Sequence, residues 1–519
     1  YQSIATMEMN GGSIVDNAAD RYGGGVMVVG GARLHMTDGT ISRNQALIGG
    51  GIAAYDLFKG AAENAGFDIH DWGTLYHCPA EFIMDGGTIS ENRAVRNSNS
   101  DLWDGGCGGG IYVGSNTVCL NAGRITGNQA DRQGGGVYVG STPYVLRMYD
   151  TLVTANTASI LGGGLWFCPT GDATNAVTNG GAIFGNTARN EVDPDAKAAG
   201  DDFVAVPQAE KEHAVSLADR MLGGGETAWH IDGGVQATAA ESGNVLGLPD
   251  ETPRFDPQNP GERITNIHMN QEGIALKAVV SEAAENLARQ QARLIVSGNS
   301  APRGGGIGSN GGIIIGTPED EWTLSVTKAW EDVLEEEYQD QSIQIYLKIG
   351  DYQLDAVTLN QENQWTAEFT QLPNPATLGN LHITVVEGGS EYEASYTWEE
   401  ADSENKLLSV LVTNHKPEIT TGSLTVKKTV SGSGDKTRSF PFEVALDEPI
   451  SGSYGQMEFT DGKAEFELKH GESITASGLP AGISYTVTET NPYGHTVTSS
   501  GTAGTIPKDG VVAASFDNY

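Results

Sequence analysis

Closely spaced acidic residues are the first candidates for chemistry, because two carboxylates that flank a glycosidic bond can hydrolyse it. Such carboxylates lie about 5 to 9 Å apart, which on a repetitive chain requires acids at matched positions of neighbouring repeats. No column of matched acids exists, and no basic residue recurs beside an acid to stabilise a carbanion. We interpret the local acid pairs as solvated loop residues, with calcium binding as the alternative. These pairs are Asp101 and Asp104, Asp193 and Asp195, and Asp201 and Asp202.

Neither a set of metal ligands nor a phosphate-binding loop can be recognised in the sequence. No Cys-x-x-Cys or Cys/His spacing indicates zinc, and the histidines are scattered. Glycine triplets recur, but no Lys-Ser/Thr pair follows them, as a phosphate-binding loop would require. We therefore expect no enzyme acting on a substrate, no cofactor and no assigned metal. The four cysteines allow one disulfide without a favoured pairing: Cys78, Cys107, Cys119 and Cys168.

Length and composition limit the domain organisation and the classes of partner. The 519 residues exceed the size of a single core, so we expect about three domains. The formal net charge of −37 argues against nucleic acid, which requires lysines and arginines that displace phosphate counterions. No apolar stretch approaches the roughly 18 residues of a membrane span, so we expect no membrane insertion. Without a recognisable signal peptide or sorting signal, the chain is expected to be a fragment of a longer protein.

A repeated motif runs through the first part of the chain and must position any site there. Residues 9–26 read MNGGSIVDNAADRYGGGV, and close copies follow at 36–52, 84–111, 120–137 and 148–165. A fixed pattern of apolar and small residues is typical of a solenoid whose repeats share one core. We therefore predict a right-handed parallel β-helix for residues 1–316.

Three columns of residues define the repeat. Isoleucine or valine stands three positions before each asparagine, and alanine stands two positions after it, where a small side chain allows a tight turn. Stacked asparagine amides can hydrogen-bond from one repeat to the next and satisfy backbone groups at the bend. We predict such a ladder for Asn17, Asn44, Asn92, Asn128 and Asn156, continued by Asn186 and Asn299.

Loops interrupt the repeats, most notably in an insertion at residues 190–293. This insertion contains helix-like stretches at 209–221 and 281–292, after which the repeat returns at 294–307. We expect the insertion to cap the solenoid or to pack against it. Loops carry function more often than regular elements do, so recognition is to be sought in the interruptions as well.

One column of the repeats is a candidate for ligand recognition. In the strand after each glycine triplet, alternation turns one residue inward and the next outward. Exposed aromatic rings stack on sugars or anchor protein interfaces, so we predict ligand binding by the aromatic members. The alternative is an exterior ladder that stabilises adjacent repeats or is covered by an insertion. The column consists of Met27, Ala53, Tyr112, Tyr138 and Trp166.

Two β-rich segments follow the repeats. Alternating apolar residues, for example at 343–349, predict antiparallel strands in a segment that spans 317–416. A stretch rich in Pro, Thr and Gly at 416–422 marks the boundary to a second segment, which spans 417–519 and again alternates. Each segment has about 100 residues, the usual size of a β-sandwich. We predict an all-β chain in which a parallel β-helix is followed by two immunoglobulin-like β-sandwich modules.

The motifs of these two segments resemble the Cna-B-type modules of collagen adhesins and pilin stalks of Gram-positive bacteria. The first segment carries SVTKAW (325–330), WTAEFTQLP (365–373), ITVVE (383–387) and VTN (412–414), in the order of that family. The second segment carries LTVKKTV (424–430), GLPAGISYTVTE (478–489) and FDNY (516–519). The resemblance covers residues 317–519 and does not extend to the repeats.

The resemblance implies an isopeptide bond inside each module, formed by a first-strand lysine and a last-strand asparagine with help from an acid. Burial disfavours the charged lysine and the charged carboxylate, so the amine becomes nucleophilic while the neutral acid polarises the amide. The alternative is that the lysines are solvated strand residues. Lys427 stands next to Lys428 and could be confused with it. Alternation from Val426 favours Lys428 as the lysine of the bond. The implied sets are Lys328, Glu387 and Asn414, and Lys428, Glu489 and Asn518.

These features together predict a cell-surface adhesin, extracellular and anchored to the cell wall of a Gram-positive bacterium in its full-length form. The β-helix would bind a host surface protein, an immunoglobulin or a glycan, and the sandwiches would form a stalk. We expect a monomer whose only catalysis is autocatalytic isopeptide formation. The alternatives are a polysaccharide lyase or glycoside hydrolase carried on the same anchor, and a structural spacer.

Overall fold

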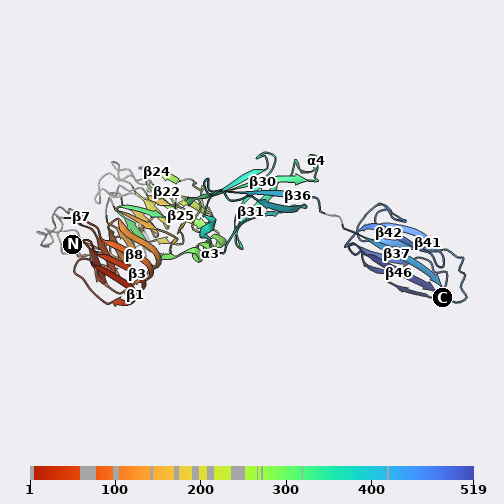
Figure 1. Cartoon of the computed structure of the whole chain (residues 1–519), viewed down its shortest axis with the longest axis horizontal. Helices are drawn as coiled ribbons and strands as arrows, with labels where there is room; N and C mark the ends of the chain where they lie inside the picture. The colour runs from red at the N-terminus through yellow and green to blue at the C-terminus, as the bar shows by residue number, and fades with distance from the viewer. Residues whose placement is uncertain are drawn as a thin grey trace. The chain divides into compact units, whose positions relative to one another are not determined.

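The computed structural model shows an all-β chain that divides into two compact units (Figure 1). The first unit contains residues 1–390 and 394–414, and the second contains residues 391–393 and 415–519. Among the described residues, no helix is long and apolar enough to cross a membrane. The described residues are 5–58, 77–97, 104–140, 144–168, 175–189, 198–206, 215–234, 252–265, 267–269, 273–317, 320–417 and 420–519.

Three sheets of mainly parallel strands, here called sheets A, B and C, form the N-terminal part of the first unit (Figure 1). The main path of sheet A is β1 (Thr6–Val15), β3 (Arg33–Ser42), β8 (Glu81–Ser90), β11 (Thr117–Thr126), β14 (Val145–Met148), β29 (Gly312–Ile315), β18 (Asn175–Val177), β22 (Val215–Leu217) and β24 (Ile267–Met269). Off this path, sheet A also includes β15 (Thr151–Thr154), β19 (Gly181–Ile183) and β26 (Leu294–Ser297).

The other two sheets pair the remaining strands of the same repeats. Sheet B consists of β20 (Thr187–Ala188), β16 (Thr157–Leu161), β27 (Ser300–Arg303), β12 (Gln129–Ala130), β9 (Arg93–Ala94) and β4 (Gln45–Ala46). Sheet C consists of β2 (Val26–Val29), β5 (Ile52–Tyr55), β10 (Ile111–Gly114), β13 (Val137–Val139), β28 (Ile307–Ser309), β17 (Leu165–Phe167), β21 (Phe203–Ala205), β25 (Ile274–Val280) and β23 (Thr227–Ile231). A separate hairpin pairs β6 (Leu57–Phe58) with β7 (His77–Cys78).

The apolar column of the repeats lies in sheet A. Parallel pairing places Ile14 beside Ile41, Ile41 beside Ile89, and Ile89 beside Ile125. Ile41, Ile89 and Ile125 are fully buried. In a parallel sheet, matched positions of successive strands stack along one line, so equivalent residues contact each other. The predicted column of inward isoleucines is therefore confirmed.

The glycine triplets lie where the backbones of successive repeats approach each other most closely. A Cβ atom on Gly109 would lie 2.3 Å from the carbonyl oxygen of Gly135 in the next repeat. Gly108, the first member of the same triplet, has a φ angle of +70°, which glycine adopts without steric cost. The triplets thus serve backbone packing between repeats.

The asparagines form a continuous ladder of hydrogen bonds. The backbone N–H and the Nδ2 group of Asn92 both donate to Oδ1 of Asn128, at 3.0 and 2.9 Å. Asn92 Nδ2 also donates to the backbone oxygen of Ile41 at 2.9 Å. Because these amides are buried, their partners remove the cost of desolvation. The same pattern connects Asn17, Asn44, Asn92, Asn128, Asn299, Asn156 and Asn186, in that order.

The last repeat is inserted between two earlier ones. β26 lies between β11 and β15, β28 between β13 and β17, and β29 between β14 and β18. The expectation that Asn299 extends the ladder beyond Asn186 is therefore wrong, because Asn299 stands between Asn128 and Asn156. Every repeat carries the same motif, so the motif does not determine which repeats become neighbours.

The described part of the 190–293 insertion ends the parallel stacking. β25 pairs antiparallel with β21 and β23 in sheet C, and β24 pairs antiparallel with β22 in sheet A. The helix predicted at 281–292 is confirmed as α3 (Glu282–Gln291), which buries Leu287. The helix predicted at 209–221 is wrong where it is described, because residues 215–217 form β22 with Val215 and Leu217 buried. Residues 209–214 of that stretch lie outside the described residues.

Residues 322–415 form the first sandwich, whose two sheets enclose alternate apolar side chains such as Leu324, Ile345 and Phe369. One sheet contains β33 (Thr366–Leu372), β30 (Trp322–Glu331), β36 (Leu407–His415) and β35 (Glu393–Trp398). The other contains β32 (Tyr352–Leu359), β31 (Ile343–Ile349) and β34 (Ile383–Gly388). The short elements are α4 (Glu335–Tyr338) and the 3-10 turn η2 (Pro375–Thr377).

The first sandwich packs against the parallel sheets within the same unit. The guanidinium group of Arg220 donates to the backbone oxygen of Thr370 at 2.8 Å and pairs with Asp355. Asn179 Nδ2 donates to the backbone oxygen of Leu372 at 3.2 Å. Arg220 and Asn179 are buried, so these direct hydrogen bonds hold the first sandwich against the parallel sheets without intervening solvent.

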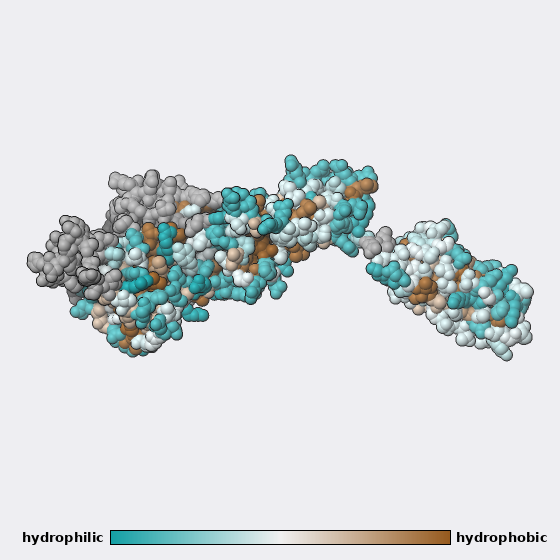
Figure 2. Space-filling view, viewed as in Figure 1, coloured by the Kyte–Doolittle hydropathy of each residue, from teal (hydrophilic) through white to brown (hydrophobic). Residues whose placement is uncertain are grey.

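Residues 421–518 form the second sandwich, which is the second unit's core. Its first strand β37 and last strand β46 are parallel neighbours, with Val430 beside Asn518. Hydrophilic residues cover most of the visible face of each sandwich, as expected when apolar side chains alternate inward (Figure 2). One sheet consists of β42 (Ser473–Pro480), β37 (Thr421–Val430), β46 (Val511–Asn518) and β44 (Val497–Ser500). The other consists of β41 (Lys463–Leu468), β38 (Phe440–Leu446), β43 (Ser484–Glu489) and β45 (Ala503–Thr505). A separate pair is formed by β39 (Gly452–Tyr454) and β40 (Met457–Phe459).

Removal of one ladder amide should destabilise the first unit. In Asn128→Ala, the backbone N–H and Nδ2 of Asn92 lose their acceptor inside the protein. We expect the free energy of unfolding to fall by about 2 to 4 kcal/mol. Asn17→Ala is the matched control, because this exposed residue lies at the end of the ladder and its loss should cost about 1 kcal/mol or less. Equal losses in urea denaturation of the two variants would contradict a cooperative buried ladder.

Candidate functional site

In the first sandwich, a lysine, a glutamate and an asparagine from three strands meet in the interior. Lys328 on β30 lies with its Nζ 3.2 Å from Oε2 of Glu387, at the end of β34. Asn414 on β36 donates from Nδ2 to Glu387 Oε1 at 2.7 Å and to Ser390 Oγ at 3.2 Å. The Lys328 and Glu387 side chains are 0% and 2% exposed. The three residues implied by the family resemblance are therefore together and screened from solvent.

The second sandwich repeats this arrangement. Lys428 Nζ lies 3.0 and 3.1 Å from the two carboxylate oxygens of Glu489. Asn518 Nδ2 donates to Glu489 Oε1 at 2.7 Å. The Lys428 and Glu489 side chains are again 0% and 2% exposed. We refer to the two sets, Lys328–Glu387–Asn414 and Lys428–Glu489–Asn518, as the buried triads.

Strand alternation decides which lysine enters the core. In β37, Leu424, Val426, Lys428 and Val430 are buried, whereas Lys427 is exposed. The side-chain period of a strand is two residues, so a one-residue shift would place the lysine in solvent. The prediction that Lys428, and not Lys427, lies inside is confirmed.

Burial shifts both triad lysines toward the neutral amine. Desolvation lowers the pKa of Lys328 and of Lys428, and it outweighs the nearby glutamates, which raise it. The Lys328 Nζ lies 4.8 Å from the ring centre of Trp330, and the Lys428 Nζ lies 4.3 Å from that of Phe440. These rings exclude water from the amine, which strengthens every electrostatic interaction at the site.

The carbonyl ends of the two asparagine amides are left without partners. Oδ1 of Asn414 and Oδ1 of Asn518 are buried and accept no hydrogen bond among the described residues. A buried carbonyl without a donor costs free energy, and a protonated carboxyl group can supply that donor. Each triad therefore brings an amine, a carboxyl group and a carboxamide together in the interior, with the carboxyl group in contact with both nitrogens.

The predicted aromatic column exists, but it is not exposed. In sheet C, Tyr112 pairs with Tyr138, and Gly308 stands between Tyr138 and Trp166. Tyr112, Tyr138 and Trp166 are only 8%, 3% and 2% exposed, so the expectation of an open stripe is wrong. They form a hydrophobic cluster with other outward residues, including Ala275 of the insertion, and this cluster covers their rings. Tyr112 and Tyr138 nonetheless line a cavity of about 420 Å³.

The acid pairs are held mainly by basic side chains. Asp104 pairs with Arg96 and with Arg132. Asp202 is fully buried, which corrects the interpretation of a solvated loop acid, and Lys277 Nζ lies 3.2 Å from it. Among the described residues, no group of three or more His, Cys, Asp or Glu side chains could hold a metal ion. Asp101, Asp193 and Asp195 lie outside the described residues.

The cysteines that the structure describes form no disulfide. Cys107, Cys119 and Cys168 are not joined in disulfides, and the side chain of Cys78 lies outside the described residues. Burial raises the pKa of Cys107 to about 12, which keeps its thiol protonated at neutral pH.

Sequence reasoning missed the group that ends the asparagine ladder. Asp202 Oδ1 accepts from the backbone N–H and Nδ2 of Asn186 at 2.9 and 3.0 Å, as the next asparagine would. Its Oδ2 accepts from Ala278 N at 2.9 Å and from Lys277. Burial lowers the pKa of Lys277, but the carboxylates of Asp202 and Asp201 outweigh it and the pKa is raised. The signal was available, because Gly200-Asp201-Asp202 stands where other repeats have Gly-Gly-Gly.

Family models match the two sandwiches separately. Residues 324–415 match the model of the Cna protein B-type domain. The Cna-B resemblance of the first module is thereby confirmed. Residues 422–519 match the model of a domain of unknown function, DUF7601.

Each of the following known proteins is similar to a part of the chain. A stretch of 122 residues is 37% identical to the pilus tip adhesin Cpa of Streptococcus pyogenes, and it covers 22% of this chain and 17% of the relative. A solved pilus-presented adhesin (Cpa) is 29% identical over 29% of this chain and 36% of its own, with a TM-score of 0.18. The major pilin from Streptococcus pyogenes is 16% identical over 39% of this chain and 99% of its own, with a TM-score of 0.20.

Loss of a triad lysine should destabilise the second sandwich far more than loss of its exposed neighbour. Lys428→Ala removes the buried Nζ partner of Glu489 and leaves a cavity where the lysine side chain was, which should cost about 2 to 4 kcal/mol. Lys427→Ala should change the free energy of unfolding by at most about 0.5 kcal/mol. Hydrogen–deuterium exchange of peptides from residues 421–518 measures both. Equal protection in the two variants would contradict the assignment of Lys428 to the core.

Proposed function

We propose that this chain is part of a cell-surface adhesin of a Gram-positive bacterium, anchored to the cell wall in its full-length form. In this proposal the three parallel sheets form one right-handed parallel β-helix that recognises a host molecule, and the two sandwiches form the stalk. The pair of complete, buried triads carries the proposal. The match of residues 324–415 to the Cna protein B-type domain and the similarity to a pilus tip adhesin support it.

Each triad is proposed to form an intramolecular isopeptide bond. The neutral lysine Nζ attacks the side-chain carbonyl carbon of the asparagine, a C–N bond forms, and the bond to Nδ2 breaks. The glutamate carboxyl group takes the proton from the amine and delivers a proton to the leaving nitrogen, which departs as ammonia. Glu387 contacts both reacting groups in the first module, and Glu489 does so in the second.

The position of the bonds fits a chain that is pulled from its ends. Lys328 on β30 and Asn414 on β36 stand on neighbouring strands, and so do Lys428 on β37 and Asn518 on β46. A covalent bond between the first and last strand of a sandwich transmits tension without breaking the hydrogen bonds of the sheet. This property suits a stalk under shear better than it suits an enzyme domain or a passive spacer.

Intact-protein mass spectrometry tests the bonds directly, because each bond removes one ammonia. The wild-type chain should weigh two ammonia molecules less than its sequence mass, and Lys328→Ala and Lys428→Ala should each restore one. Lys427→Ala is the matched control and should retain both losses. Lys277→Met should also retain both, because Lys277 is ion-paired with Asp201 and Asp202 and has a raised pKa. A wild-type mass equal to the sequence mass would refute the bonds.

The partner of the N-terminal region is proposed to be a host surface protein, an immunoglobulin or a glycan, bound by a monomeric chain. Tyr112 and Tyr138 are kept as ligand-binding candidates because they line the 420 Å³ cavity, and Trp166 shares their column. The similarity of part of the chain to an adhesin supports this role.

Binding assays separate the adhesin from its alternatives. The immobilised chain should retain at least one member of a panel of host glycoproteins, immunoglobulins and glycans, and Tyr138→Ala should weaken that binding about tenfold if the cavity is used. The exchange protection of β13 and β28 in this variant serves as the folding control. New reducing ends or unsaturated products from polysaccharides would instead identify an enzyme, and binding to no member of the panel would favour the spacer.

A further inference from the structure

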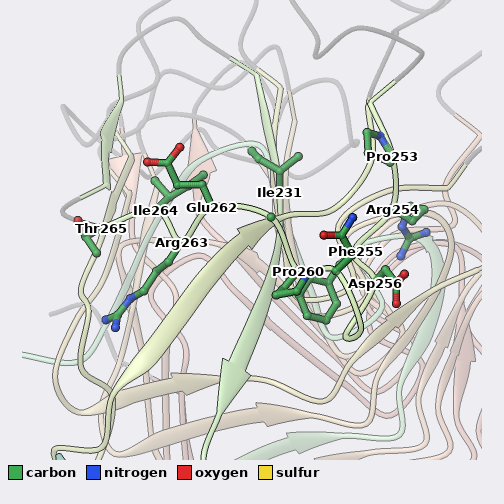
Figure 3. A pocket seen from close by; sticks show the side chains of 12 residues that line it. Ile231, Pro253, Arg254, Phe255, Asp256, Pro260, Glu262, Arg263, Ile264 and Thr265 are labelled. Carbon is green, nitrogen blue, oxygen red and sulfur yellow. The ribbon is translucent and has the colours of Figure 1, made fainter. Parts of the chain in front are cut away.

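A second cavity, of about 650 Å³, lies in the described part of the insertion (Figure 3). It is formed between the end of β23 at Ile231 and the segment 253–265, and we call it the 253–265 pocket. Its volume lies within the range of small-molecule sites, which is about 300 to 1,000 Å³. The pocket belongs to neither the buried triads nor the aromatic column.

One end of the segment is anchored by a saturated arginine. Arg254 Nε donates to Asp232 Oδ1 at 2.6 Å, and Nη1 donates to the backbone oxygens of Ala188 and Ala198 at 2.8 and 2.9 Å. Asp232 is 1% exposed, and its Oδ1 also accepts from Phe255 N at 2.9 Å. Charge-assisted hydrogen bonds of this number fix the backbone on one side of the pocket.

The other end of the segment is anchored to β23. The backbone N–H of Ile264 donates to the oxygen of Trp229 at 2.9 Å, and Arg263 Nη2 lies 3.0 Å from Glu226 Oε1. Between the anchors, Asp256 Oδ1 accepts from Gln258 N at 2.9 Å and holds a turn. The space beneath the turn is therefore preformed, and a ligand does not have to order the loop.

Part of the pocket wall is apolar. Figure 3 shows the side chains of Ile231, Phe255 and Pro260 around the same space. One face of Phe255 packs on His230, with ring centroids 5.3 Å apart, which holds the Phe255 ring in place. A fixed aromatic ring beside a proline provides a surface on which the apolar face of a sugar ring can stack.

The polar groups of the pocket include carboxylates, an amide and a hydroxyl group, and Nε of the lining residue Arg263 is buried without a hydrogen-bond partner among the described residues. Both arginines of the lining are engaged by carboxylates outside the pocket. The side chains of Asn259, Glu262 and Thr265 make no hydrogen bond to any described residue, and Asp256 and Glu262 have no cationic partner there. Unpaired carboxylates disfavour a sulfated or sialylated ligand, whereas a neutral sugar offers hydroxyl donors to carboxylates and amides.

We propose that the 253–265 pocket binds a neutral glycan, with its apolar walls against a sugar ring and with Asn259 and Glu262 accepting hydrogen bonds from the hydroxyl groups. This inference rests on the proposed adhesin function and gives it a ligand class. A lysine-containing peptide would also find carboxylates here, and the tripeptide probe described below distinguishes it from a neutral sugar.

Saturation-transfer NMR on the full chain tests the proposal with defined probes. The probes are uncharged galactose-, mannose- and N-acetylglucosamine-terminated oligosaccharides, their sialylated and sulfated forms, and a lysine-rich tripeptide. We expect binding of at least one uncharged oligosaccharide and weaker binding of its charged forms. Binding of none of the uncharged probes, or stronger binding of the charged forms or of the tripeptide, would overturn the proposal.

Two variants locate the binding in the pocket. Asn259→Ala and Glu262→Gln should each weaken the affinity for the uncharged probe about tenfold, which is the effect of one hydrogen bond to the ligand. Gln258→Ala is the matched control, because Gln258 is the neighbour of Asn259 but does not line the pocket. Unchanged affinity in Asn259→Ala and Glu262→Gln would overturn the assignment. If these variants still bind the host panel like the wild type, the pocket assignment fails while the adhesin proposal stands.

Discussion

The buried asparagine ladder is the interaction on which the N-terminal half of the molecule depends. Each amide joins the backbone of its own repeat to the amide of the next and to a strand end of the preceding one. The arrangement works only when an asparagine recurs at the same place in successive strands, so it imposes the register of all three sheets. The last asparagine of the ladder, Asn186, also needs a group that accepts hydrogen bonds from its backbone N–H and its Nδ2. Asp202 is this acceptor, and Lys277 forms an ion pair with it. The insertion that carries Lys277 is thus a structural requirement of the repeats.

Among the described residues, a lysine, an acid and an asparagine meet at Lys328, at Lys428 and at Lys277, and the electrostatics of these places differ. At Lys328 and Lys428, one carboxyl group faces the amine and aromatic rings surround it, so burial dominates and the pKa falls. At Lys277, two carboxylates stand within 3.3 Å and the pKa rises. The same residue types therefore shift the lysine toward the neutral amine in the sandwiches and toward the charged form in the ladder, while burial raises the pKa of Asp202.

Much of the fold could be predicted from the sequence because it depends on local periodicity, whereas the members of the buried triads were implied by the family resemblance. The spacing of the repeats predicted the asparagine and isoleucine columns, and strand alternation chose Lys428 over Lys427. Features that depend on contacts between distant segments could not be predicted in this way. The burial of Tyr138 and Trp166 depends on outward residues of other strands and of the insertion, and the 253–265 pocket depends on anchors spread from Ala188 to Ile264.

The inserted last repeat has a consequence for how the chain can be synthesised. Asn128 and Asn299 are neighbours in space but 171 residues apart in sequence, and Asn156 lies 143 residues from Asn299. Ordinary repeat arrays stack each unit on the one made just before it. Here β26 lies between β11 and β15, so these two strands lack a neighbour until β26 has been synthesised. Placing β26 between them closes long loops, and the entropy cost of this closure must be overcome before the ladder is continuous. A chain that is synthesised from its N-terminus therefore cannot complete its ladder repeat by repeat, and the ladder becomes continuous only after the last strands before the first sandwich have been made.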